Sequence, residues 1–133
     1  MKIRMSLKNI ENQETKSYEL EYISYYYNSS YSTESDSTEI SSTPASIGIN
    51  CSIASTEVDT FLLRWMIQKK AVMAGEIMIT DILTSETIRK FTFEGAKATH
   101  HSEGYSKDVS SQYNSEISIT FKKINLNGVD LID

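Results

Sequence analysis

Residues 55–70 read STEVDTFLLRWMIQKK and have the clearest helical pattern in the chain. The apolar residues of this stretch recur every three or four positions, so they would form one stripe along a helix: Val58, Phe61, Leu62, Trp65 and Met66. Thr56 can cap the start of that helix, and Asp59 follows three residues later, as in a capping box. The pattern predicts one helix that packs on a β-sheet.

Two more apolar residues, Leu63 and Ile67, make the stripe wider than one packing face needs. The simpler interpretation is that the helix only covers a sheet. The functional interpretation is that the additional apolar width contacts a neighbouring subunit. Leu63 and Ile67 are therefore candidate interface residues.

Outside this helix, apolar and polar residues mostly alternate, which is typical of strands with one buried face. We predict strands over residues 2–8, 18–27, 46–53, 76–83, 87–93, 96–106 and 116–124. The first two are expected to form a hairpin, as are the fourth and fifth. We expect a positive φ at Gly75 and a bulge at Gly104, because glycine tolerates both. This order of elements predicts a mainly β fold, a small antiparallel barrel or sandwich flanked by one helix.

The run Tyr25-Tyr26-Tyr27 places aromatic side chains on both faces of its predicted strand. Packing between neighbouring strands is the simpler explanation. A bulge, or an interface on the outer face, would also account for the run. Tyr25 and Tyr27 are therefore further interface candidates.

Residues 28–43, NSSYSTESDSTEISST, interrupt the strand pattern with a Ser/Thr-rich, acidic segment. A loop of this length within a compact domain is usually functional or disordered. Two interpretations stand side by side: a solvated loop, and an arm that becomes ordered on contact with another subunit. The second interpretation adds one aromatic and three acidic interface candidates: Tyr31, Glu34, Asp36 and Glu39.

The length and composition of the chain restrict the classes of protein to which it can belong. A length of 133 residues is that of one domain, and 39% hydrophobic with 23% charged residues is typical of a soluble globular protein. A net charge of −5 argues against nucleic acid as a partner. We expect no signal peptide and no membrane insertion, because no segment approaches the ~20 apolar residues that span a bilayer. The single cysteine, Cys51, alternates with apolar residues and is interpreted as a small core residue.

Residues that could carry chemistry are few and scattered. His100 and His101 are adjacent, so on a strand they face opposite sides and do not easily share a metal ion. Four carboxylates lie near predicted strand ends without a spacing that pairs them: Asp81, Glu86, Glu94 and Glu103. The chain has no phosphate-binding glycine loop, nucleophile elbow or Cys-x-x-Cys motif. The sequence thus predicts no catalytic, cofactor-binding or metal-binding residue, and favours an assembly or binding protein over an enzyme.

Several segments occur together in a familiar order. They are the helix core Leu62-Leu63-Arg64-Trp65-Met66, the strand start Gly75-Glu76-Ile77, the segment RKFTFEGA at 89–96, Tyr105, and the closing strand ISITFKKI at 117–124. In this order they resemble the Hcp (TssD) family, the tube proteins of type VI secretion systems, in the version found in Bacteroidetes. The resemblance extends over roughly residues 45–125, and the first forty residues match only in layout.

This resemblance implies a β-barrel flanked by one helix, hexameric rings, and rings stacked into a hollow tube. The tube is ejected with a spike protein and effector proteins when an outer sheath contracts. No catalysis and no cofactor are implied, and members assemble in the cytoplasm and leave without a signal peptide. By position, residues 28–43 would contribute to contact between rings. Their acidic Ser/Thr composition departs from the family pattern, which suggests a paralogue that mixes with other tube proteins or recognises a particular cargo.

Two other functions stay open at this point. One is a stand-alone β-barrel or sandwich binding module that uses residues 28–43 for recognition, and it predicts a monomer. The other is a small enzyme with a site assembled by the fold, and it predicts a deep pocket with converging polar groups. The tube subunit predicts a cyclic oligomer of six copies and an annular particle.

Overall fold

A computed structural model of the chain describes residues 1–28, 31–33, 40–42, 46–68, 71–105, 107 and 114–131, with the backbone alone for residues 31–33 and 40–42. The helical elements are a 3-10 turn η1 (Ser55–Glu57) and the helix α1 (Thr60–Ile67). The strands are β1 (Lys2–Asn9), β2 (Thr15–Leu20), β3 (Tyr22–Asn28), β4 (Tyr31–Thr33), β5 (Ile40–Ser42), β6 (Ser46–Ala54), β7 (Met73–Thr80), β8 (Thr87–Glu103), β9 (Asn114–Thr120), β10 (Lys123–Leu126) and β11 (Val129–Asp130).

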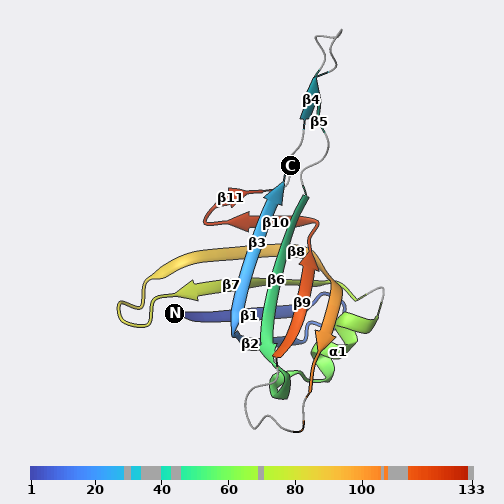
Figure 1. Ribbon diagram of the computed structural model, residues 1–133, viewed down its shortest axis with the longest axis vertical. Helices are drawn as coiled ribbons and strands as arrows, with labels where there is room; N and C mark the ends of the chain where they lie inside the picture. The colour runs from blue at the N-terminus through green and yellow to red at the C-terminus, as the bar shows by residue number, and fades with distance from the viewer. Residues whose placement is uncertain are drawn as a thin grey trace.

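The strands form two layers that share β8. The β1 layer contains β2, β1, β7, residues 87–96 of β8, β10 and β11. The β6 layer contains residues 97–103 of β8, then β9, β6 and β3. Every pairing is antiparallel, and the strands of the β6 layer run steeply across those of the β1 layer (Figure 1). The apolar faces of both layers therefore meet in one core.

The predicted alternation decides which side chains enter that core. The most deeply buried apolar residues come from both layers and from α1: Met5, Leu7, Ile49, Ile53, Leu62, Trp65, Met73, Ile77, Phe91, Phe93, Ile117 and Ile119. Trp65 is fully buried, and its indole N–H donates to the carbonyl oxygen of Ala96 at 3.1 Å. Since Ala96 lies where β8 passes from one layer to the other, this bond fixes α1 against the bend of β8.

The helix is shorter than predicted and begins at Thr60. The preceding residues Val58 and Asp59 have extended backbone conformations, so the helix cannot start at Thr56. Asp59 is the N-cap instead, because its Oδ1 accepts a hydrogen bond from the backbone N–H of Leu62 at 3.0 Å. The same oxygen accepts from the Tyr18 hydroxyl at 2.8 Å, which joins the helix start to β2. The capping prediction for Thr56 is therefore wrong.

The predicted strand bounds are wrong at three places where the chain passes from one layer to the other. The stretch 18–27 divides at Glu21, whose N–H donates to the Ser52 carbonyl oxygen at 2.9 Å, and becomes β2 and β3 in different layers. The stretch 116–124 likewise divides into β9 and β10. The stretches 87–93 and 96–106 are instead one strand, β8, which bends between the layers. The two predicted hairpins, β1–β2 and β7–β8, are confirmed.

The bend of β8 contains a glycine with a positive φ. Gly95 has a φ of +63°, a conformation that glycine adopts at low cost. Gly75 lacks a positive φ and lies within β7, where a Cβ atom would come 2.0 Å from the Ser6 carbonyl oxygen. Gly104 follows the end of β8, and the register shift of that strand against β9 lies between Ala98 and His100. The predictions for Gly75 and Gly104 are therefore wrong.

The predicted class, mainly β and antiparallel with one flanking α-helix, is confirmed, but the sheet is open. Among the described residues, β2 and β3 stand at the two ends of the strand order and each has one unpaired edge. Within the segment predicted as a loop, β4 and β5 pair as a small separate hairpin (Figure 1). Tyr and Ile at the ends of this pairing favour strands, which outweighs the Ser-rich composition.

Candidate assembly surfaces

The outer edge of β3 carries a row of exposed tyrosines. β3 pairs with β6 in unbroken register from Tyr22 opposite Ser52 to Asn28 opposite Ser46, so the described strand has no bulge. Tyr22, Tyr25, Tyr26 and Tyr27 are each about half exposed. An unpaired strand edge offers its free N–H and C=O groups to another strand. This edge is therefore the part of the β6 layer most open to pairing with a second chain.

The tyrosines of β3 face both sides, as predicted from the run. The Tyr25 ring packs edge-on against Phe91, with ring centroids 5.1 Å apart, so it joins the β1 layer. The Tyr26 ring lies over Gly48 on the opposite face, where a Cβ atom at residue 48 would come 2.7 Å from the ring. Packing against the neighbouring strand thus involves Tyr26, whereas Tyr25 packs between the two layers. Contact of Tyr25 or Tyr27 with another subunit stays a prediction.

The far edge of the β6 layer is residues 97–103 of β8. These residues pair with β9 on one side, and no described strand pairs with them on the other. Helix α1 lies beside this edge in Figure 1. The β6 layer therefore ends in one open edge at β3 and one at β8.

The outward face of the β6 layer is polar. A shallow groove of about 360 Å³ crosses its strands and is lined by the side chains of Tyr22, Asn50, Ser52, His100, Glu116 and Ser118. The Ser118 hydroxyl donates to Asn50 Oδ1 at 2.8 Å, which connects β9 to β6 across the groove. Sequence reasoning gave no role to Tyr22, although the polar positions of β6 and β9 were recognisable from their alternation.

The outward face of α1 is partly apolar. Leu63 is 36% exposed and Ile67 is 74% exposed. Together with Thr60, Arg64 and Gln68, they line a shallow groove of about 280 Å³. The extra apolar width of the helix thus does not rest on the sheet. Its contact with another subunit remains a prediction.

The remaining interface candidates lie in the 28–43 segment. Glu34, Asp36 and Glu39 fall outside the described residues, and of Tyr31 only the backbone is described, as the start of β4. The structure therefore gives no side-chain geometry for these four residues.

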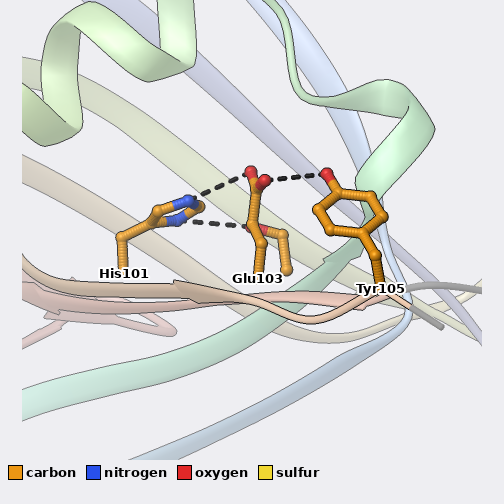
Figure 2. Close-up of polar contacts among 4 residues, drawn as sticks. His101, Glu103 and Tyr105 are labelled. Atoms are coloured by element: carbon orange, nitrogen blue, oxygen red, sulfur yellow. Dashed lines mark hydrogen bonds and ion pairs between the residues drawn. The ribbon is translucent and has the colours of Figure 1, made fainter.

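A chain of polar contacts joins the ends of β8 and β9. His101, Glu103 and Tyr105 alternate along the chain and point to the same side (Figure 2). His101 Nε2 lies 3.0 Å from Glu103 Oε1, and the Tyr105 hydroxyl donates to Glu103 Oε2 at 2.8 Å. This hydrogen bond raises the pKa of the Tyr105 phenol, because ionisation beside the carboxylate is unfavourable. The spacing of two residues on a strand could have predicted this cluster.

The same cluster includes a serine, and its connectivity resembles that of a hydrolase triad. Ser115 Oγ lies 3.3 Å from His101 Nδ1. Ser115 is 0% exposed, however, so its hydroxyl cannot reach a substrate. His100 faces the other side of β8 and lines the polar groove, as expected for adjacent strand residues. We interpret the cluster as a connection between β8 and β9.

Other features of the described residues bear on chemistry. Cys51 is buried in the core, and burial raises the pKa of its thiol to about 12. Within the described ranges, no group of three His, Cys, Asp or Glu residues is placed to hold a metal ion. In the same ranges, no helix has the length and apolarity to cross a bilayer.

Comparison with known proteins gives a consistent result. The model of one protein family, described as Hemolysin coregulated protein Hcp (TssD), matches residues 1–133. Among curated proteins, no match to this chain was found. The solved structure of Hcp1 from Flavobacterium johnsoniae is similar to this one with a TM-score of 0.66 and 19% identity, over 97% of this chain and 98% of that chain.

Two larger assemblies contain similar chains. The baseplate of the anti-feeding prophage, described as 6-fold symmetrised, has a chain that matches with a TM-score of 0.65 and 9% identity, over 96% of this chain and 93% of that chain. The sheath-tube complex of an extracellular contractile injection system has one with a TM-score of 0.61 and 12% identity, over 95% of this chain and 89% of that chain. At these identities the likeness shows a shared fold.

Proposed function

Because this chain belongs to the Hcp (TssD) family and is a tube subunit, we propose that six copies close into a ring through the two open edges of the β6 layer. The observation that carries this proposal is the β6 layer itself, which ends in an unpaired edge at β3 and another at residues 97–103 of β8. A ring of copies pairs every such edge with its complement and leaves none exposed.

The directions of the strands suit this junction. The four strands of the β6 layer alternate in direction from β8 through β9 and β6 to β3. In a cyclic ring all copies point the same way, so β3 of one copy runs antiparallel to β8 of the next. The antiparallel pattern thus continues without interruption around the ring.

The size of such a ring is that of a hollow tube. Strands lie about 4.8 Å apart, so four strands span about 19 Å and six copies give a circumference of about 115 Å. The corresponding diameter is about 37 Å between backbones, and strand tilt enlarges it. Side chains on the inner wall leave an open channel at this diameter.

The burial of the β6 layer suggests which face lines the channel. One face is covered by the β1 layer and contains Ile49, Ile117 and Ile119. Only the polar face, with Asn50 and Ser118, remains to face the centre of a ring. We therefore propose a channel wall rich in hydroxyl, amide and carboxylate groups.

The finer roles follow from membership of the family. We propose that rings stack into the inner tube of a type VI or related contractile injection system, inside a sheath and behind a spike protein. The tube assembles in the cytoplasm and is ejected with effector proteins. Mixed tubes with paralogous subunits are compatible with the acidic 28–43 segment. The chain acts as a structural component and carries out no reaction of its own.

Sedimentation and electron microscopy of the purified protein test the ring. We expect six-copy annular particles for the wild type, and mainly monomers for Tyr27→Lys, because lysine on a strand edge opposes pairing with another strand. Val129→Lys is the control, since Val129 is similarly exposed but lies on β11, outside the β6 layer. A wild type that stays monomeric at all concentrations would contradict the proposal and favour a stand-alone binding module.

A further inference from the structure

The turn between β7 and β8, residues 81–86, is an apolar tip that no described part of the chain covers. Leu83 is 95% exposed and Ile82 is 67% exposed. Large apolar side chains at the end of a hairpin lose favourable burial unless another surface covers them. Neither residue contributes to the core of this chain.

The tip is held in one conformation by bonds of its own. Asp81 Oδ1 accepts hydrogen bonds from the N–H groups of Leu83, at 2.8 Å, and Thr84, at 3.3 Å. The Asp81 N–H donates to the Glu86 carbonyl oxygen, and the Ser85 N–H donates to the Asp81 carbonyl oxygen, both at 2.9 Å. A surface that is already ordered binds at a smaller entropic cost. The exposed leucine is thus presented on a rigid turn.

The tip and α1 lie at opposite sides of the molecule, the tip beyond the β3 edge of the β6 layer and α1 at its β8 edge. In Figure 1 the β7–β8 turn extends past β3 on the left, and α1 lies beyond β8 on the right. Joining β3 of one copy to β8 of the next therefore carries the tip of the first copy toward α1 of the second.

We propose that the tip of each copy docks in the α1 groove of the next copy around the ring. This inference rests on the proposed ring. The groove supplies apolar surface from Leu63 and Ile67 for Ile82 and Leu83 of the neighbour. A head-to-tail contact of this kind needs two different complementary surfaces on each copy, and the chain has both.

The charges at the two surfaces are complementary. Arg64 lies on the groove and forms no ion pair with any residue that the structure describes. The carboxylates of Asp81 and Glu86 begin and end the tip. Opposite charges at the rim of an apolar contact favour the correct partner and orientation.

A disulfide experiment tests the contact directly. A double variant with Leu83→Cys and Ile67→Cys should form covalent ladders up to the full ring on oxidation, seen by non-reducing electrophoresis. Because the tip and α1 lie on opposite sides of one copy, the bond can form only between copies (Figure 1). Each single variant should remain unlinked, since a head-to-tail ring keeps like residues apart. Cys51 is buried and does not interfere.

Charged variants give a second, independent measurement. Leu83→Asp and Ile67→Asp should each raise the concentration at which rings dissociate by roughly tenfold or more, because interface anchors dominate binding energy. Val129→Asp, exposed on β11, should leave that concentration unchanged. In an equimolar mixture of the two variants only one kind of junction is intact, so at concentrations between the wild-type and variant values dimers should prevail over rings.

The results of these experiments distinguish a failure of the tip docking from a failure of the proposed ring. A monomeric wild type contradicts both. Two results together would overturn the docking of the tip and leave the ring intact. The first is that Leu83→Asp rings dissociate at the same concentration as wild-type rings. The second is that the double cysteine variant forms rings but no covalent ladders. Disulfide bonds in the Leu83→Cys single variant would indicate like-with-like contact and would also overturn it.

Discussion

The two faces of the β6 layer differ sharply although they are built from the same strands. On the face toward the β1 layer, Ile49, Cys51, Ile117 and Ile119 are almost completely buried. On the other face, Asn50, Glu116 and Ser118 line a shallow open groove. Alternate residues of one strand thus differ in role. Those on the buried face stabilise the fold, and those on the open face remain available to line a channel or contact a partner.

The largest effect should come from the buried face. Ile119→Ala should lower the free energy of unfolding by about 2–5 kcal/mol, because it removes buried apolar volume and leaves a cavity. Thr120→Ala, on the next residue and the open face, is the matched control and should change it by about 0.5 kcal/mol or less. Urea denaturation followed by circular dichroism measures both. Equal losses would show that the faces do not differ as described.

A second, smaller effect should depend on pH. Burial raises the pKa of Cys51 from 9.0 to about 12 in the folded chain. Its stabilising contribution is therefore complete below pH 9 and is lost as pH rises, since the unfolded thiol ionises first. Between pH 8 and pH 10 the wild type should lose about 1.4 kcal/mol more stability than Cys51→Ala. Urea denaturation of both proteins at the two pH values measures this difference. Parallel losses would mean that the thiol is not shielded from water.

The smallest effect should come from the open face. Asn50→Ala removes the hydrogen bond from Ser118 at the surface, which should cost about 0.5 kcal/mol. Thermal unfolding of this variant and the wild type provides the measurement. A loss as large as that of Ile119→Ala would mean that the polar groove contributes to folding and is not simply a free surface.

The contrast between the faces could be predicted from the sequence, because strand alternation is local. The strand predicted over residues 46–53 was expected to bury one face, and the structure buries its alternate residues Ile47, Ile49, Cys51 and Ile53. The class of fold followed from the same pattern, whereas the family resemblance rested on the order of several sequence segments, the helix core among them. The open sheet could not be predicted, because closure depends on how distant strand edges approach each other.

The passage of strands between layers was not predictable for a related reason. The alternation breaks at Gly95, where the strand in fact continues, and it runs on through Glu21, where the chain in fact divides, so the sequence pattern does not show which stretch bends and which divides. Similarly, Thr56 and Asp59 are both suitable caps, and only the extended backbone of Val58 decides between them. In each case tertiary contacts, and not the local sequence, determine the strand bounds or the N-cap residue.

The surfaces proposed for assembly were found only in part. Leu63 and Ile67 were named from the excess width of the helical stripe, and they are exposed. Ile82 and Leu83 were assigned to a strand because their apolar character continued its pattern, whereas Asp81 ends β7 and forms the turn. An aspartate followed by two apolar residues and Thr-Ser is a turn signal that could have corrected this assignment.

The burial of Cys51 has a consequence for the fate of a tube outside the cell. The chain contains no second cysteine, and its only thiol lies in the core, out of reach of a neighbouring copy. Oxidising surroundings therefore cannot join subunits covalently. In the proposed ring the subunits would be held by reversible contacts alone, so dilution after ejection should release individual subunits.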